Sequence, residues 1–119
     1  MKKTVVIGAS TKPERYAYKA TVALKKHFHE VVPLGLRSGD INGTAILVGK
    51  PEIENVDTVT LYLGPQNQPE FYEYIIGLKP KRVIFNPGTE NSEFEAMLEK
   101  NNIEPVEACT LVMLSIGNY

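Results

Sequence analysis

The chain has 119 residues, is 43% hydrophobic and 23% charged, and carries a formal net charge of −1 at pH 7. This composition is typical of a single globular domain over residues 1–119. It excludes an intrinsically disordered chain, which would have fewer apolar residues and a larger net charge. No run of Lys or Arg exceeds two residues, and no apolar stretch is long enough for a signal peptide or a bilayer span. We therefore expect a cytoplasmic protein that binds neither nucleic acid nor membranes.

Short apolar runs rich in Val and Ile predict buried strands. In chain order these runs cover residues 4–7, 31–34, 58–63 and 82–85, with a weaker candidate at 105–109. The glycine-containing stretch 36–55 predicts a loop region, with at most a short helix or an edge strand.

Apolar residues at helical spacing predict a helix after the first, third and fourth of these strands. The first helix is expected to begin near the start signal formed by Ser10, Thr11 and Pro13. The apolar faces of the three helices consist of Ala20, Ala23, Leu24 and Phe28, then Phe71, Tyr74, Ile75 and Leu78, then Phe94, Met97 and Leu98.

Strands that alternate with helices predict parallel βαβ units with right-handed crossovers. Near-continuous apolar runs are typical of strands that helices cover on both faces. The predicted fold is therefore α/β and Rossmann-like, a three-layer parallel sheet with helices on both faces. We expect the first strand to lie inside this sheet rather than at its edge.

The junction between the first strand and the first helix consists of the small residues Gly8, Ala9 and Ser10. Gly8 permits a tight turn and a close backbone approach, while the free N–H groups of a helix N-terminus favour an anion. The full G-x-G-x-x-G pattern is absent, since Ser10 and Pro13 stand where its second and third glycines would be. An ordinary turn followed by a helix cap, with no ligand, is therefore the alternative for these residues. A position at the carboxyl end of a strand favours the phosphate loop.

Three basic residues, Lys12, Arg15 and Lys19, follow this loop and are candidates to contact phosphate. Arg15 is the strongest candidate, because a planar guanidinium matches phosphate oxygens. Each of the three side chains can instead be a solvated surface charge.

The end of the second strand bears on the choice of nucleotide. Domains that bind NAD usually place Asp or Glu there to contact the ribose, but this strand continues through Pro33 and Gly35 to Arg37, with no carboxylate before Asp40. An arginine favours a ligand with an additional ribose phosphate, such as coenzyme A or NADP. The alternative for Arg37 is a solvated loop residue.

Two further loops follow predicted strands at the same edge of the sheet. Tyr62, Gly64 and Pro65 come after the third strand, where Tyr62 could stack on a ligand and Pro65 could simply open a helix. The fourth strand is followed by a similar loop, of Asn86, Pro87 and Gly88, and then by Asn91 or Ser92 as a helix cap.

The sequence contains no pattern that points to catalysis. His27 and His29 are two residues apart, so they do not share a helix face, and they suit a helix end and a surface position better than a metal or catalytic pair. No Walker loop, Gly-x-Ser-x-Gly or His-Glu-x-x-His occurs. We therefore expect a binding module rather than an enzyme, with no metal site.

Several motifs together carry a resemblance to a known family. They are Val6-Ile7-Gly8-Ala9-Ser10, the cluster 15–19, the strand 31–34, the loop 39–43, the strand entry 56–59, Asn86-Pro87-Gly88 and Glu107-Ala108-Cys109. On these residues the chain resembles the small stand-alone CoA-binding domains, which are similar to the nucleotide-binding domain of the succinyl-CoA synthetase α subunit. The chain departs from this family at two places. Members of the family often have Asn and a second Pro where this chain has Gly35-Leu36, and a basic residue where it has Ala108.

The resemblance implies non-catalytic binding of coenzyme A or an acyl-CoA. The alternatives are an NADP-binding, oxidoreductase-like domain and a ligand-free remnant that acts in protein interaction. Cys109 is expected to be a small buried hydrophobic residue, the alternative being a mixed disulfide with the CoA thiol. The expected ligand-binding residues are Gly8, Ala9, Ser10, Arg15, Tyr16, Lys19, Pro33, Gly35, Arg37, Tyr62, Gly64, Pro65, Asn86, Pro87 and Gly88.

Overall fold

The computed structural model describes all 119 residues and has four helices, two 3-10 turns and seven strands. Their order is β1 (Thr4–Ala9), α1 (Tyr16–Lys26), β2 (Val31–Gly35), β3 (Gly39–Ile41), β4 (Thr44–Val48), β5 (Thr58–Leu61), η1 (Pro65–Asn67), η2 (Pro69–Phe71), α2 (Tyr72–Leu78), β6 (Arg82–Phe85), α3 (Ser92–Lys100), β7 (Glu104–Glu107) and α4 (Thr110–Ile116).

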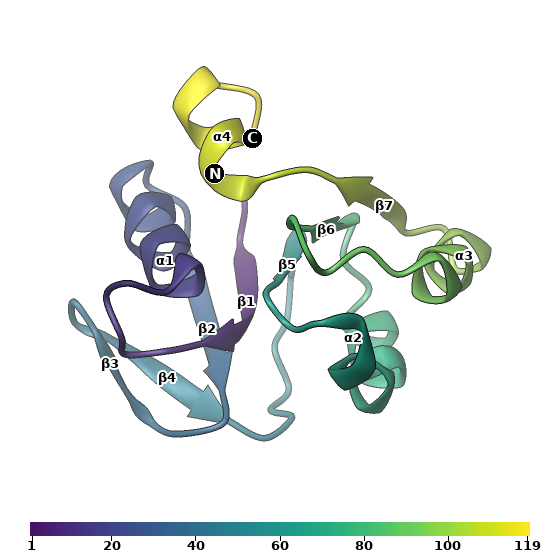
Figure 1. Cartoon of the computed structure of the whole chain (residues 1–119), viewed down its shortest axis with the longest axis horizontal. Helices are drawn as coiled ribbons and strands as arrows, with labels where there is room; N and C mark the ends of the chain where they lie inside the picture. Colours follow the sequence, from purple (N-terminus) through teal and green to yellow (C-terminus); the bar gives the residue numbers. More distant parts are fainter.

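The strands form one seven-stranded sheet in the order β3-β4-β2-β1-β5-β6-β7 (Figure 1). Every neighbouring pair is parallel except β3 and β4, which are antiparallel. The first strand lies at the centre, paired with β2 on one side and β5 on the other. The prediction of an α/β, Rossmann-like sheet with an internal first strand is confirmed.

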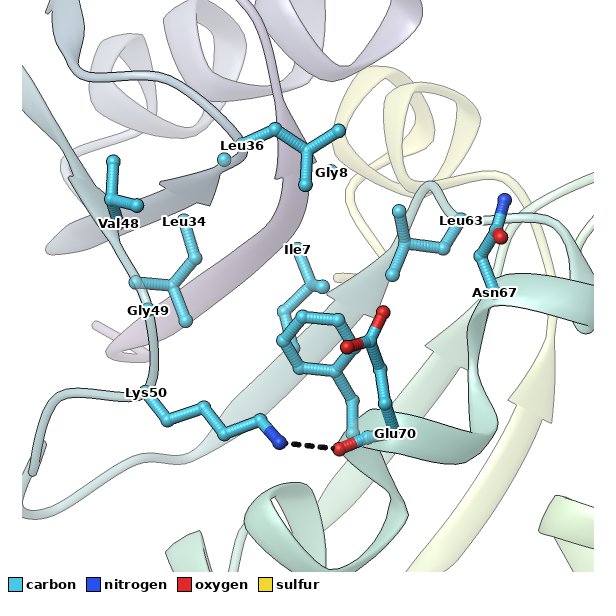
Figure 2. Close-up of a pocket in the computed structure, with 12 residues that line it drawn as sticks. Ile7, Gly8, Leu34, Leu36, Val48, Gly49, Lys50, Leu63, Asn67 and Glu70 are labelled. Carbon is cyan, nitrogen blue, oxygen red and sulfur yellow. Dashed lines mark hydrogen bonds between the residues drawn. The ribbon is translucent and has the colours of Figure 1, made fainter.

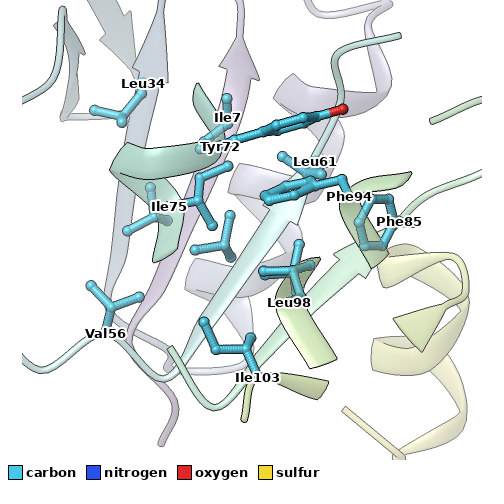
Figure 3. Close-up of a cluster of buried hydrophobic side chains, with 13 residues drawn as sticks. Ile7, Leu34, Val56, Leu61, Tyr72, Ile75, Phe85, Phe94, Leu98 and Ile103 are labelled. Atoms are coloured by element: carbon cyan, nitrogen blue, oxygen red, sulfur yellow. The ribbon is translucent and has the colours of Figure 1, made fainter. Parts of the chain in front are cut away.

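Helices cover both faces of the sheet. Successive residues of β1 point to opposite faces, and because both sets are apolar, each face must be covered. Val5 and Ile7 belong to a core of 13 buried residues that includes side chains of α2 and α3, and Figure 3 shows this cluster. Val6 points to the other face, where it joins a smaller cluster with side chains of α1 and α4. The two cores make the fold three-layered, as expected.

Aromatic packing holds α2 and α3 together over the larger core. The rings of Tyr72 and Phe94 stack with centroids 4.3 Å apart, and Phe85 meets Phe94 edge-on at 5.8 Å. The N-terminus of α3 is capped by Asn91, whose side chain accepts a hydrogen bond from the Phe94 N–H, so one of the two expected caps is confirmed.

The stretch 36–55 contains more regular structure than the expected loop. It forms the antiparallel hairpin β3–β4, with β3 as an edge strand and β4 paired to β2. The hairpin turns at Asn42 and Gly43, both with positive φ (47° and 87°), which is the two-residue turn that Asn-Gly favours. That dipeptide was the local signal for the hairpin.

The first helix begins later than predicted. It starts at Tyr16, and the Ser10 hydroxyl instead accepts a hydrogen bond from the Lys12 N–H (3.1 Å) inside a loop that precedes the helix. Phe28 was predicted on the apolar face of this helix, but it lies beyond the C-cap at φ 64° and is 77% exposed. The final helix, α4, was not predicted. No helix is both long enough and apolar enough to serve as a membrane span.

Candidate functional site

The carboxyl ends of the parallel strands meet at one edge of the sheet, and three neighbouring clefts lie there. The first cleft lies between the ends of β2 and β4 and the η1–η2 segment, with a volume of about 380 Å³. The second, of about 290 Å³, lies above the loop after β1, and the third, of about 240 Å³, lies beside the start of α4. Ligands of open α/β sheets bind in this position.

The first cleft is largely apolar, with charged groups at its border (Figure 2). The Lys50 ammonium donates a hydrogen bond to the backbone carbonyl of Glu70 at 2.7 Å and lies 5.4 Å from the centroid of the Phe71 ring. The Glu70 side chain extends into the same cleft. The apolar residues that line the first cleft are Ile7, Leu34, Leu36, Val48, Leu63 and Phe71.

The second cleft combines backbone turns with the start of α1. Gly8 has φ 98°, and a Cβ at this position would lie 3.0 Å from the carbonyl carbon and oxygen of Tyr62. Glycine therefore lets the end of β1 approach the segment after β5. Gly8 and Ala9, which were predicted in the loop, form the end of β1, where the pairing with β2 is irregular between Ile7 and Ala9. The N-cap residue of α1, Arg15, makes no side-chain cap and no acidic residue occupies the first turn, so the helix N–H groups remain available to an anion.

The third cleft continues from the second, because Tyr16, Tyr62 and Pro87 line both. Its far end is formed by Cys109, which is half-buried, and Leu111. The expectation of a fully buried cysteine is therefore too strong. Gly8 lines both the first and the second cleft, so the three form one continuous path along the strand ends.

Tyr62 stands at the junction of the second and third clefts with a buried hydroxyl that has no hydrogen-bond partner. Burial raises the pKa of Tyr62 to about 12, against a smaller lowering by the nearby hydroxyls of Thr110 and Thr60. Those two hydroxyls bond to each other at 2.8 Å. The phenol therefore stays protonated at neutral pH.

The raised pKa of Tyr62 predicts a loss of stability at alkaline pH. The unfolded chain releases the proton near pH 10 and the folded chain near pH 12, so the free energy of unfolding falls as pH rises between these values, by about 2–3 kcal/mol in total. Between pH 9 and 11 the parent protein should lose roughly 1 kcal/mol more than Tyr62→Phe in urea denaturation. Equal losses in the two proteins would contradict this account.

Eight of the expected ligand-binding residues meet in the second cleft. They are Gly8, Ser10, Arg15, Tyr16, Tyr62, Gly64, Pro87 and Gly88. Gly35 lines the first cleft and Asn86 the third. The Asn86 amide is engaged within the protein, since it donates to the Thr60 hydroxyl (2.6 Å) and the Leu61 carbonyl (2.9 Å) and accepts from the Thr110 N–H (2.9 Å).

The remaining five expected residues line none of the three clefts: Ala9, Lys19, Pro33, Arg37 and Pro65. Pro33 is buried inside β2, and Arg37 is exposed in the bend that follows β2. The Lys19 ammonium lies 5.2 Å from the centroid of the Tyr16 ring, so this lysine borders the second cleft only through its aromatic neighbour.

Sequence reasoning missed a buried amide that joins the loops of the site. Gln68 is 0% exposed, and its Nε2 donates to the carbonyls of Leu63 (2.9 Å) and Thr89 (2.8 Å). Its Oε1 accepts from the Asn91 side chain at 2.9 Å. Leu63 lines the first cleft and Thr89 the second, so one side chain ties together two loops that border the site. A polar residue next to Pro69 carries no local signal of burial.

The two histidines lie away from the clefts. A ring nitrogen of His27 is 2.9 Å from the Ala23 carbonyl, at the end of α1, and His29 accepts a hydrogen bond from the Lys2 N–H. Burial, with a smaller effect of nearby positive charges, lowers the pKa of His29. No group of three or more His, Cys, Asp or Glu side chains is arranged to hold a metal ion.

Comparison with known proteins gives a family. Residues 2–115 match the model of a family described as a CoA binding domain. None of the curated proteins matches this chain.

Solved structures share the fold over nearly the whole chain. A crystal structure described as that of an uncharacterized protein is 57% identical, with a TM-score of 0.98, covering 100% of this chain and 98% of the other. A hypothetical protein from Pyrococcus horikoshii OT3 is 25% identical, with a TM-score of 0.88 and coverage of 97% and 82%. A protein from Thermus thermophilus, 22% identical with a TM-score of 0.87 and coverage of 99% and 90%, shows the same fold.

Proposed function

Because this chain belongs to the CoA binding domain family, we propose that residues 1–119 act as one domain that binds coenzyme A, or an acyl-CoA, without catalysing a reaction. The observation that carries the proposal is the order of the three clefts along the strand ends. The first and third clefts are mainly apolar, the second lies at the Gly8 turn and the N-terminus of α1, and the second shares lining residues with each of the other two. Coenzyme A presents a flat base, a pyrophosphate and a pantetheine arm in the same order.

The adenine ring would occupy the first cleft. The six apolar side chains that line it provide surfaces for a flat aromatic ring, and a volume of about 380 Å³ falls within the range of small-molecule sites. The ribose would lie toward Gly8, where the first and second clefts meet.

The pyrophosphate would occupy the second cleft, on the Gly8-Ala9-Ser10 loop. Three features support this placement: the glycine turn, the uncapped N-terminus of α1, and the exposed Arg15 guanidinium, which makes no ion pair within the protein. The helix N–H groups and the guanidinium together provide charge-assisted hydrogen bonds to phosphate oxygens. The Gly64 and Gly88 backbones border the same space from the loops after β5 and β6.

The pantetheine arm would pass between Tyr16 and Tyr62 into the third cleft, with its thiol end toward Cys109. The absence of catalysis is part of the proposal, and the side-chain contacts support it. Of the titratable side chains that line the three clefts, none hydrogen bonds to another, so no nucleophile is paired with a base.

Ligand-induced stabilisation tests this function. Thermal unfolding is measured without ligand and with CoA, dephospho-CoA, NADP or NAD, each at the same concentration. A ligand that binds only the folded state at 100 times its Kd adds about 2.7 kcal/mol to the free energy of unfolding. We expect the largest rise in midpoint with CoA and the smallest with NAD. A larger rise with NADP would favour the oxidoreductase-like alternative, and no rise with any of the four would contradict nucleotide binding.

A further inference from the structure

Lys50 is held at the border of the first cleft. It follows the end of β4 and Gly49, whose φ of 88° redirects the chain there. Its ammonium donates to the Glu70 carbonyl at 2.7 Å, and Figure 2 shows this hydrogen bond across the cleft. The ammonium also lies 5.4 Å from the centroid of the Phe71 ring. These two contacts restrain a side chain that is exposed to solvent.

The charge of Lys50 is not neutralised by these contacts. A backbone carbonyl and an aromatic ring are both uncharged partners. The protein has two ion pairs, Lys3–Glu30 and Lys81–Asp57, and Lys50 takes part in neither. The Glu70 carboxylate lines the same cleft but is not within ion-pair distance of the Lys50 ammonium. A fixed, unpaired cation beside an apolar cleft is suited to an anionic group on the ligand.

Arg37, the basic residue that sequence reasoning favours for the ribose phosphate, lacks the contacts of Lys50. Both side chains are exposed and neither makes an ion pair, but Arg37 lines none of the three clefts and its side chain makes no hydrogen bond. An unrestrained side chain loses about 0.5–1.5 kcal/mol of conformational entropy when a ligand immobilises it. Lys50 has already lost part of this freedom.

We propose that Lys50 binds the phosphate on the ribose of the nucleotide, and that it is therefore the residue that distinguishes CoA from dephospho-CoA. The inference rests on the proposed function, because it places the adenosine end of the ligand in the first cleft. The Glu70 carboxylate opposes an anion in the same space and limits the affinity for the phosphorylated ligand.

The test is a double-mutant cycle between Lys50→Met and the ribose phosphate, measured by isothermal titration calorimetry with CoA and dephospho-CoA. Methionine keeps an apolar chain over Phe71 and removes the charge. CoA affinity should fall about tenfold or more, while dephospho-CoA affinity changes less than roughly twofold. Glu70→Gln should change the ratio in the opposite direction. Arg37→Met is the matched control, at an exposed position close to the same cleft, and should leave the ratio unchanged.

Each other outcome overturns the inference in a recognisable way. If Arg37→Met lowers the CoA preference and Lys50→Met does not, Arg37 binds the phosphate. If neither variant changes the ratio while the parent protein binds both ligands, the inference fails and the proposed function stands. If the parent protein binds neither ligand, the proposed function fails and the inference fails with it. A circular-dichroism melt of each variant establishes that the fold is retained.

Discussion

Replacing Gly8 with valine is expected to lower the free energy of unfolding by about 2–6 kcal/mol. Two physical effects add: a non-glycine residue at φ 98° is strained by roughly 1–3 kcal/mol, and overpacking costs about 1–3 kcal/mol more. The overpacking arises because a Cβ would lie 3.0 Å from the Tyr62 carbonyl group, and neither β1 nor β5 can move away inside a paired sheet. Urea denaturation at neutral pH measures the loss.

Gly43→Val is the matched control for the clash. Gly43 has a similar φ of 87°, but no atom lies within 4 Å of an added Cβ in its exposed hairpin turn. The control therefore carries the backbone strain without the contact to Tyr62. If Gly8→Val loses no more stability than Gly43→Val, the close approach of Gly8 to Tyr62 is not a constraint on the fold.

The same position tests the phosphate loop. Gly8→Ala introduces the Cβ without further bulk, so a folded fraction can be studied at low temperature. We expect this variant to lose CoA binding by at least roughly tenfold, because the backbone turn that presents the loop must shift. Unchanged affinity in the folded variant would rule out phosphate binding at Gly8-Ala9-Ser10.

Replacing Gln68 with glutamate is expected to cost about 2–5 kcal/mol of stability, although the two side chains have nearly the same shape. The change removes the donor that Leu63 and Thr89 carbonyls share, leaves both without that partner, and places a carboxyl group at a position that is 0% exposed. Because the two loops border the first and second clefts, CoA affinity should fall as well.

The pH dependence separates the lost donor from a general packing defect. Burial favours the protonated form of the introduced carboxyl and raises its pKa in the folded state. The stability of Gln68→Glu should therefore fall as pH rises from about 4 toward 8, relative to the parent protein. Gln66→Glu is the matched control: the same change at an exposed residue of the same segment should alter stability by less than about 0.5 kcal/mol. Similar losses in the two variants would contradict a special role for Gln68.

The sequence by itself determines the architecture and the position of the loop after β1. Val5, Val6 and Ile7 form an uninterrupted apolar run because both faces of a central strand are buried, and this requirement is visible in any such strand. The apolar face of α3 and its cap at Asn91 are equally local, since i, i+3 and i+4 neighbours alone determine them. Phe28 shows the limit of the rule, because it keeps helical spacing but lies past the left-handed turn that ends α1.

Only the tertiary structure decides which polar side chains border the clefts. Lys50 reaches the first cleft because β4 pairs with β2, and Glu70 meets it from a segment 20 residues further along the chain. Gln68 is buried because the loops after β5 and β6 close over it, a contact between segments 21 residues apart. Strands and helices can be predicted from local sequence, because the spacing of their apolar residues matches the period of the element. The surroundings of a loop side chain depend instead on distant segments, whose arrangement follows from the packing of the whole sheet.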